Sequence, residues 1–526
     1  MSKHFDSPAS RRHFLRQAGA MSALVGTGAA PLALNLAALG AASAQAAGEY
    51  RALVCLFFYG GNDAYNMLLP TDASSWNAYT LTRTQAPDPI ALLAPGTPPL
   101  LTAPVGSPAR LGGVLPIAPL RAQGRSFALH PLLGSLQTLF DTDKRLAILP
   151  NIGPLILPTD KTQYASTSHP KPPRLFSHND QQATWQALAP EGATRGWGGL
   201  MGDVLASQNT LPIFTAISAA GNAVFLSGNS ILQYQVNTSG AVPLGVNAAG
   251  QVYGSADVGA ALQRIVRNAR QTHPFDKDLA DVAGRSIDAE LALRTALRAA
   301  SDPAFGTPPA SGNYNAANDP KLQYLNPLTG NLAANGLAQQ FQIVARLVDA
   351  GLRGATQARR QVFFVSLGGF DTHDFQNRNQ ADLMARLAQA LKYFDDTMGG
   401  LNARSQVTLF TGSDFGRTFT SNGDGTDHGW GSHHFVMGGA VAGGDLYGRF
   451  PILGIKNTNN NNFDSSPDQL GNGSLLPQTS VEQLGNTLGR WMGLSDSTLA
   501  GIFPNLANFP AASRDLGFFT TPAARF

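Results

Sequence analysis

Cysteine and charge are both scarce in this sequence. Cys55 is the single cysteine among 526 residues, so no disulfide can form within the chain and cysteine ligation of an iron–sulfur cluster is excluded. Only 13% of the residues are charged, and removing residues 1–46 takes away four basic residues and one acidic residue and leaves 33 of each sign. A mature chain without net charge has no overall positive charge that would attract nucleic acid or an anionic membrane.

Two nucleotide-binding signatures are also missing. The glycine turn at residues 60–63 (GGND) lacks the lysine and hydroxyl residue of a P-loop, and the sequence has no dinucleotide fingerprint. These absences argue against a redox enzyme.

An export signal is the first feature that is present. Residues 10–16 (SRRHFLR) carry paired arginines, an apolar run rich in Ala and Gly follows at 18–39, and small residues at 42–46 offer cleavage sites. This pattern predicts a twin-arginine signal peptide at residues 1–46, the twin-arginine translocase as a partner, and a periplasmic or secreted protein. An uncleaved anchor is the alternative, but Pro31 interrupts the run, so we expect no permanent membrane span.

The mature part of the chain alternates helix and strand patterns. Continuous apolar runs are typical of buried parallel strands, and helix-period patterns precede two of them, which predicts an α/β fold with a mostly parallel sheet. The strand-like runs are residues 50–59, 362–367 and 407–411, and the helical patterns are 337–350 and 382–398. We expect one α/β domain at residues 47–526, with a turn-rich cap or insertion at about 205–335.

Ionisable residues gather in three short motifs: GGFDTHD (368–374), TGSDFGRT (411–418) and GTDHGWGSHH (425–434). Four of the ten histidines lie within them. The first two motifs follow predicted strands, and ligands of open α/β sheets bind at the carboxyl ends of strands. Imidazole and carboxylate together are ligands for zinc, manganese or iron. The sequence thus predicts a metal site at this edge.

Asp371 and His373 are the first candidate ligands, because one intervening residue lets both reach one ion if the backbone is extended. The alternative is a turn in which Asp371 accepts backbone hydrogen bonds. Asp427 and His428 repeat the Asp and His pattern and are further candidate ligands.

Four other residues have a functional and a structural interpretation. Asp414 and Arg417 could supply a metal ligand and a clamp for a tetrahedral oxyanion, or could pair with each other and brace the loop. Ser177 stands at a predicted helix start, where its hydroxyl is a candidate nucleophile or an ordinary N-cap. His178 beside it is a candidate ligand or base.

Together these motifs resemble the twin-arginine-exported family with the domain of unknown function 1501, related to the sulfatases and alkaline phosphatases. The motifs that carry the resemblance are FYGGND (58–63), SH (177–178), GW (196–197), GGFDTH (368–373), SDFGRT (413–418) and GTDHGW (425–430). They span nearly the whole mature chain. The resemblance implies an α/β/α sandwich like that of alkaline phosphatase, three layers thick, with the site at the carboxyl ends of the strands.

The resemblance also implies roles for single residues. Asp63 matches the aspartate that follows the first strand and holds metal, and Ser177 matches the nucleophile. Asp371 with His373, and Asp414, match further ligands, and His428 or His433 matches the last histidine. His433 and His434 are adjacent on a predicted strand and face opposite sides, so at most one joins the site.

The chain departs from the superfamily pattern in three ways. Asp371 and His373 are separated by one residue rather than three, Phe415 stands where the superfamily has an imidazole, and no Cys/Ser-x-Pro-x-Arg motif is present. A single ion, a rearranged pair of ions and a site without catalysis therefore all remain open.

We expect an exported metal-dependent hydrolase of phosphate or sulfate esters, acting on a small-molecule or polymer substrate with one or two divalent ions (zinc, manganese, calcium or iron). The alternative is a non-catalytic exported protein for binding or cell-surface assembly on the same fold. Long loops rich in Pro, Ala, Asn and Gly suit that alternative.

Overall fold

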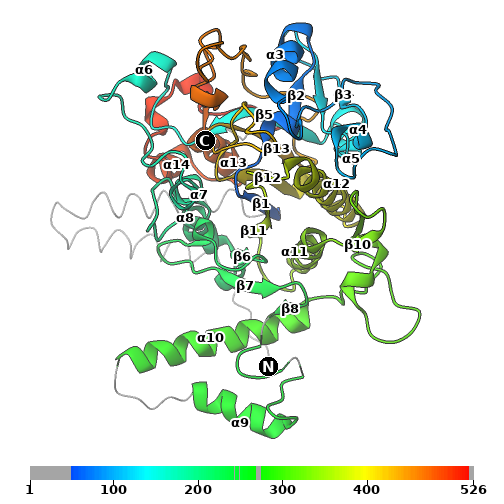
Figure 1. Ribbon diagram of the computed structural model, residues 1–526. Helices are drawn as coiled ribbons and strands as arrows, with labels where there is room; N and C mark the ends of the chain where they lie inside the picture. The colour runs from blue at the N-terminus through cyan, green and yellow to red at the C-terminus, as the bar shows by residue number, and fades with distance from the viewer. Residues whose placement is uncertain (1–48, 242, 248, 268–273, 521–526) are drawn as a thin grey trace, which may run out of the picture. The chain divides into compact units, whose positions relative to one another are not determined.

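The apolar run after residue 49 forms the central strand of a large sheet in the computed structural model (Figure 1). The structure describes residues 49–520 except 242, 248 and 268–273, so the predicted signal peptide at 1–46 lies outside the described residues. The strand order is β14-β5-β13-β12-β1-β11-β6-β7-β8. The bounds are β1 (Arg51–Tyr59), β5 (Leu146–Gly153), β6 (Ala216–Ser218), β7 (Tyr234–Asn237), β8 (Gly240–Ala241), β11 (Arg360–Gly368), β12 (Val407–Ser413), β13 (Ser432–Met437) and β14 (Thr479–Ser480).

Most neighbours in this sheet run parallel. β1 pairs in parallel with β11 and β12, and β6 and β7 continue the parallel direction on one side. β13 is antiparallel to both β12 and β5, and β8 is antiparallel to β7. The predicted α/β class with a mostly parallel sheet is confirmed. Two small antiparallel sheets flank it, made of β2 (Leu68–Pro70), β3 (Leu115–Ile117) and β4 (Phe127–Leu129), and of β9 (Gln323–Leu325) and β10 (Leu332–Ala334).

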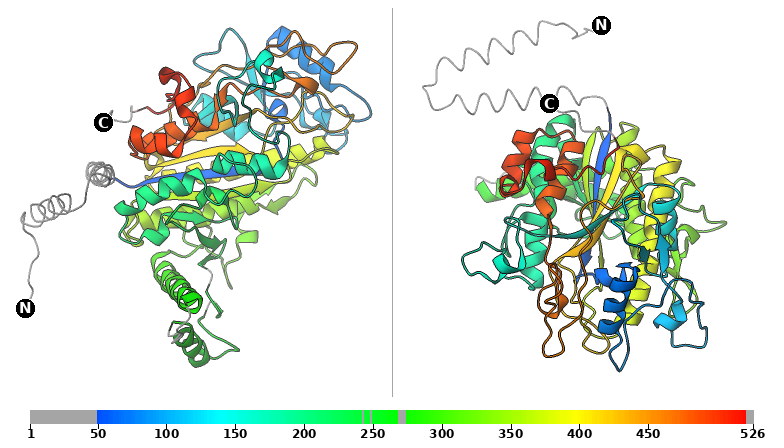
Figure 2. Two further views of the ribbon diagram at one scale, coloured as in Figure 1. Left: turned by 90° about the vertical axis from the view of Figure 1, so that its left-hand side faces the viewer. Right: turned by 90° about the horizontal axis from the view of Figure 1, so that it is seen from above.

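Helices pack on both faces of the sheet (Figure 2) and form a hydrophobic core on each face. Because side chains of a strand alternate between the two faces, successive residues of β1 belong to different cores. Val54, Leu56 and Phe58 join one core, whereas Leu53, Cys55 and Phe57 join the other. The helices of the first core include α5 (Gly134–Asp141), α11 (Gly336–Leu352) and α12 (Gln376–Gly400). Those of the second include α7 (His178–Ala187), α8 (Trp197–Leu205), α13 (Val481–Trp491) and α14 (Asp496–Ile502).

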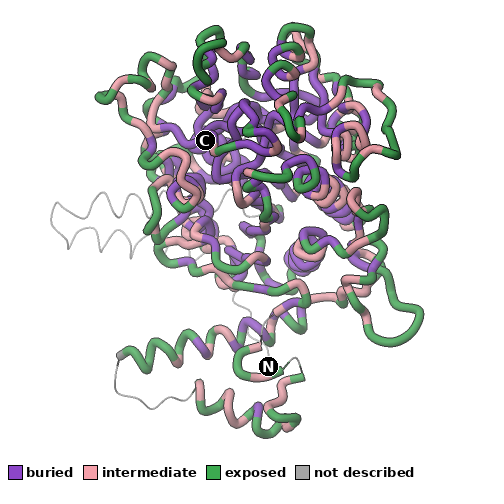
Figure 3. Tube along the Cα trace, viewed as in Figure 1, coloured by how far each residue is buried: buried purple, intermediate pink, exposed green. Residues whose placement is uncertain are grey.

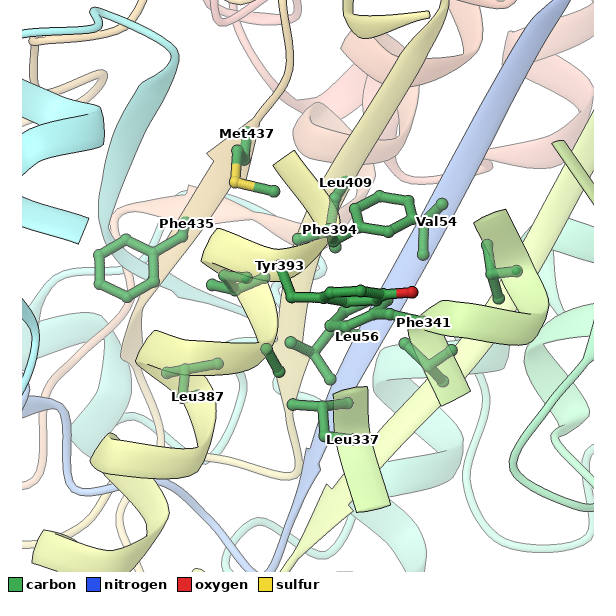
Figure 4. Packing of buried hydrophobic residues seen from close by; sticks show 14 of the residues in the cluster. Val54, Leu56, Leu337, Phe341, Leu387, Tyr393, Phe394, Leu409, Phe435 and Met437 are labelled. Carbon is green, nitrogen blue, oxygen red and sulfur yellow. The ribbon is translucent and has the colours of Figure 1, made fainter. Parts of the chain in front are cut away.

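The first core is shown from close by in Figure 4. Phe341 of α11 and Phe394 of α12 stack with ring centroids 4.7 Å apart, beside Val54 and Leu56 of β1. Each fully buried side chain of this kind stabilises the fold by about 1.5–3 kcal/mol. Burial follows the sheet and the helix faces turned toward it (Figure 3).

The turn-rich range at about 205–335 contributes to the sheet and also extends beyond it. β6, β7 and β8 are part of the central sheet, whereas α9 (Ala256–Arg267) and α10 (Pro274–Ala296) lie past the β8 edge (Figure 1). The remaining short helices are α3 (Ala73–Arg83), α4 (Pro108–Leu111) and α6 (Lys161–Ala165). Of the helices in the described part of the chain, none combines the length and the apolar character needed to cross a membrane.

Candidate metal centre

Three loops that follow parallel strands meet at one edge of the sheet. Tyr59 of β1 is level with Gly368 of β11, and Phe58 is level with Ser413 of β12, so the chain leaves all three strands at the same height. Gly60 has φ +112°, and a Cβ there would overlap the backbone nitrogen of Asp371. Only glycine therefore lets the turn after β1 approach the loop after β11 so closely.

His178, Asp371 and His428 form a cluster whose ligand atoms all lie within 4.8 Å of one another. His178 Nε2 is 3.4 Å from Asp371 Oδ2, and His428 Nε2 is 3.4 Å from Asp371 Oδ1. His373 Nε2 is 3.1 Å from Asp371 Oδ1 and 3.0 Å from His428 Nε2. Oxygen and nitrogen ligands about 2.1 Å from one ion are themselves about 3.0–3.4 Å apart, so these spacings fit a common ion.

Each of the three imidazoles has its other ring nitrogen held by a separate acceptor. His178 Nδ1 is 2.7 Å from Asp414 Oδ2, His428 Nδ1 is 2.7 Å from the carbonyl oxygen of Phe176, and His373 Nδ1 is 3.3 Å from an Asp427 oxygen. A carbonyl or carboxylate oxygen accepts from N–H, which leaves the Nε2 lone pair facing Asp371. Histidines that bind metals are typically oriented in this way.

Two buried atoms in the centre have no hydrogen-bond partner among the described residues, His178 Nε2 and Asp414 Oδ1. An unpartnered buried nitrogen with its lone pair turned to a carboxylate is unfavourable unless another group binds it. The donor set thus fits a divalent ion, with nitrogen and oxygen ligands of the kind that zinc, manganese and iron accept.

Asp414 and Arg417 do not pair with each other. Asp414 is fully buried and accepts from His178, from Gln182 Nε2 at 2.9 Å and from the Gly60 amide at 3.1 Å. Arg417 Nη1 donates to Asp371 Oδ1 at 2.6 Å and to the Gly60 carbonyl at 3.3 Å. Its Nε and Nη2 donate to Thr426, so the guanidinium braces Asp371 with its donors already engaged.

Asp63 lies outside the histidine cluster and is paired with Arg83. Arg83 Nη1 is 2.6 Å from Asp63 Oδ2 and Nη2 is 3.0 Å from Asp63 Oδ1, and both side chains are fully buried. The Arg83 guanidinium thus binds both carboxylate oxygens of Asp63, the residue that the resemblance assigned as a metal ligand.

Ser177 and His433 make their hydrogen bonds to other partners than the three Nε2 atoms. Ser177 precedes the first residue of α7 in extended conformation, and its Oγ donates to Asp180 Oδ2 at 2.9 Å rather than capping the helix. His433 is buried inside β13, where Nδ1 accepts from the Asn151 amide at 3.0 Å and the ring lies against Phe450. His434 faces the other core, against Trp185, so the two histidines point to opposite sides as predicted.

Hydrogen bonds, charges and burial shift the pKa values of the groups in the centre in different directions. The hydrogen bond between His178 and Asp414 raises the pKa of His178, which favours the protonated imidazole. Burial lowers the pKa of His428, which favours the neutral imidazole. Burial alone would raise the pKa of Asp371, but the hydrogen bond and charge of Arg417 lower it below its usual value. At neutral pH Asp371 is therefore charged and His428 neutral, as a metal ligand requires.

One known family matches most of the chain. The sequence model of the family described as "Protein of unknown function (DUF1501)" matches residues 50–503. The chain belongs to the DUF1501 family. No curated protein matches this DUF1501 chain.

One solved structure with some likeness to the DUF1501 chain is described as "Crystal structure of Ps i-CgsB in complex with k-i-k-neocarrahexaose". The two chains are 6% identical, the alignment covers 89% of this chain and 78% of that chain, and the TM-score is 0.33. A likeness at that score carries no argument about fold or function.

Sequence reasoning missed the groups that orient the candidate ligands of the DUF1501 chain. Gln182 donates to Asp414 from the same helix as His178, four residues later, and that i, i+4 spacing is a signal that could have found it. The Phe176 carbonyl and the Asp63 partner Arg83 have no comparable signal, because tertiary folding alone brings them to the site.

Proposed function

We propose that the chain is an exported metal-dependent hydrolase of phosphate or sulfate esters, with a three-layer fold like that of alkaline phosphatase. The observation that carries this proposal is the convergence of three imidazole Nε2 atoms on Asp371, each imidazole oriented through its Nδ1. The position at the carboxyl ends of parallel strands supports it. The choice of ester rests on the resemblance to sulfatases and alkaline phosphatases, and export on the arginine pair at residues 11 and 12.

His178, Asp371 and His428 would hold the ion, with His373 as a fourth ligand. A bound divalent ion would polarise the ester and lower the pKa of a water molecule. Asp414 holds His178 in the tautomer that presents Nε2, and Arg417 holds Asp371 in place. The side chain of Asp371 is 44% exposed and that of His373 is 40% exposed, so a substrate can approach the centre from solvent.

The attacking group is either Ser177 or water. The Ser177 hydroxyl donates a hydrogen bond to Asp180 Oδ2. That carboxylate can accept the hydroxyl proton when the Ser177 oxygen attacks. The Ser177 hydroxyl also lies at the N-terminus of α7, where backbone N–H groups and the helix dipole favour a bound anion.

Metal content and hydrolysis measured together test this proposal. The exported protein, purified without chelator, would be compared with His178→Ala and His428→Ala variants by elemental analysis and by assay on aryl phosphate and aryl sulfate. His169→Ala is the matched control, because that partly buried histidine forms a hydrogen bond with Thr159 Oγ1, at 2.9 Å, and has no partner in the proposed centre among the described residues. Stoichiometric metal and ester hydrolysis, both lost in the two site variants and kept in the control, are expected.

Other outcomes separate the alternatives. Undiminished metal content in a folded His178→Ala/His428→Ala double variant would contradict the proposed centre. Metal bound at this centre without hydrolysis of either ester would favour the non-catalytic binding protein.

A further inference from the structure

A buried chain of hydrogen bonds connects Asp63 with Asp371. Gln376 Nε2 donates to Asp63 Oδ2, and Gln376 Oε1 lies 2.7 Å from Thr426 Oγ1. Arg417 Nε lies 3.2 Å from the same Thr426 hydroxyl, and Arg417 Nη1 lies 2.6 Å from Asp371 Oδ1. Every member except Asp371 is at most 1% exposed, so solvent does not replace these bonds.

The two ends of this chain fix the direction of every bond between them. Asp63 accepts, because its carboxylate faces the Arg83 guanidinium, and Arg417 can only donate. Gln376 must therefore turn its amide nitrogen to Asp63 and its oxygen to Thr426. The Thr426 hydroxyl then donates its hydrogen bond to Gln376 Oε1 and accepts one from Arg417 Nε. No flipped amide or rotated hydroxyl satisfies both neighbours.

We propose that Asp63, Gln376 and Thr426 are positioning residues that act on the candidate metal centre through Arg417. This inference rests on the proposed function, since it takes Asp371 as a ligand. The Asp371 oxygen that Arg417 binds is the oxygen that also faces His373 and His428. The guanidinium therefore sets both the orientation and the effective charge of that oxygen. Partners behind the ligands of a metal site typically change metal affinity about 10–100-fold when removed.

Asp63 has a structural role after the first strand, where its side chain pairs with Arg83 and not with the histidine cluster. Its side chain receives Arg83 and Gln376 and also accepts from the Tyr65 amide at 3.2 Å. In this chain the first-strand carboxylate anchors the hydrogen bonds behind the centre, and the candidate metal ligands come from the start of α7 and from the loops after β11 and β12.

The test breaks the chain of hydrogen bonds at Thr426, where a substitution of nearly equal shape exists. Thr426→Val removes the hydroxyl, and Thr426→Ser restores it without the methyl group. Thr397→Val is the matched control, because that buried threonine of α12 donates to the Tyr393 carbonyl of its own helix, at 2.8 Å. The probe is Co²⁺, added to metal-free full chain and followed through its visible absorption spectrum and by titration of its affinity.

We expect Thr426→Val to weaken Co²⁺ binding about 10–100-fold and to alter the visible spectrum. Thr426→Ser should recover the wild-type spectrum, and Thr397→Val should match wild type in both readouts. A folded Thr426→Val protein with wild-type affinity and spectrum would overturn the inference while leaving the metal centre intact. Wild-type protein that binds no Co²⁺ would overturn the centre and the inference together.

Gln376→Met provides a second variant if Thr426→Val does not fold. Methionine keeps the length of glutamine but can neither donate to Asp63 nor accept from Thr426. The same weakened affinity and altered spectrum are expected. An unchanged Co²⁺ spectrum in folded Gln376→Met would equally overturn the inference.

Discussion

The ion pair of Asp63 and Arg83 is the most deeply buried ion pair among the described residues. Both side chains are fully buried, and Arg83 also donates to Asn66 Oδ1 at 2.8 Å and to the Thr418 carbonyl at 2.9 Å. Arg83→Met would leave the Asp63 carboxylate buried without a counter-charge. We expect it to lower the free energy of unfolding by about 3–5 kcal/mol, measured by urea denaturation.

Lys392→Met is the control for that prediction. Lys392 pairs with Asp396 on the surface of α12, where the two side chains are 40% and 54% exposed. Removing an exposed pair should change the free energy of unfolding by less than about 1 kcal/mol. An equal decrease in the free energy of unfolding in the two variants would show that the buried ion pair stabilises the fold no more than the exposed one.

Buried neutral histidines make stability depend on pH. Burial lowers the pKa of His434 to about 3, below its value of about 6.5 in an unfolded chain. Between these two values the unfolded chain binds a proton that the folded protein does not. The contribution of such a histidine to the free energy of unfolding is therefore fully present above about pH 6.5. It is lost as the pH falls toward 3, by about 1.4 kcal/mol per pH unit for each such group.

His434→Phe tests this dependence, because phenylalanine keeps the aromatic contact with Trp185 but does not titrate. The free energy of unfolding of the variant should fall less steeply between pH 6.5 and pH 4.5, by the slope of one proton, in urea titrations at several pH values. Parallel curves for the variant and the wild type would contradict the assignment of that proton to His434.

Single residues of the centre could be predicted from the sequence only where a local rule applies. Asp371 and His428 stand in motifs that combine imidazole, carboxylate and glycine, His178 stands at a predicted helix start, and the structure brings the three together. The pairing of Asp63 with Arg83 follows no local rule, since the arginine ends a separate helix, α3. The chemical role of a carboxylate depends on which cation folding brings to it.

At the scale of elements, the packing of α7 on β12 determines where His178 lies. A Cβ at Gly412 of β12 would lie 2.8 Å from Trp185 Cζ3, and Trp185 belongs to the helix that begins with His178. Gly412→Ala should displace α7, reduce Co²⁺ affinity at the centre, and lower the free energy of unfolding by about 1–3 kcal/mol.

The control for this element is Gly400→Ala, at the exposed end of α12, where an added Cβ meets nothing within 4 Å. It should leave Co²⁺ affinity unchanged in the same titration. Wild-type affinity in Gly412→Ala would show that α7 accommodates the methyl group without moving His178.

Element types were easier to predict than their ends. The runs at residues 50–59, 362–367 and 407–411 lie within or overlap β1, β11 and β12, because a strand buried on both faces must be apolar throughout. The helix predicted at 382–398 begins earlier, at Gln376, after Phe375 in left-handed conformation with no capping side chain. Without a capping signal, the sequence pattern does not mark that start.

At the scale of the whole molecule, the centre joins segments that only folding brings together. His178 begins α7, Asp371 follows β11 and His428 lies beyond β12, so an unfolded chain offers no site of comparable affinity. A ligand that binds only the folded state stabilises it by RT ln(1 + [L]/Kd), about 2.7 kcal/mol at a hundredfold excess over Kd.

Zn²⁺ at that excess should therefore raise the free energy of unfolding of the metal-free protein by about 2.7 kcal/mol in urea denaturation, and a chelator should reverse the gain. The His178→Ala/His428→Ala variant should show no gain, because Asp371 and His373 alone cannot complete the donor set. An equal gain in that variant would mean that zinc stabilises the protein from another place. If only the wild type gains free energy of unfolding, then metal binding at the edge where the three central strands end stabilises the whole fold.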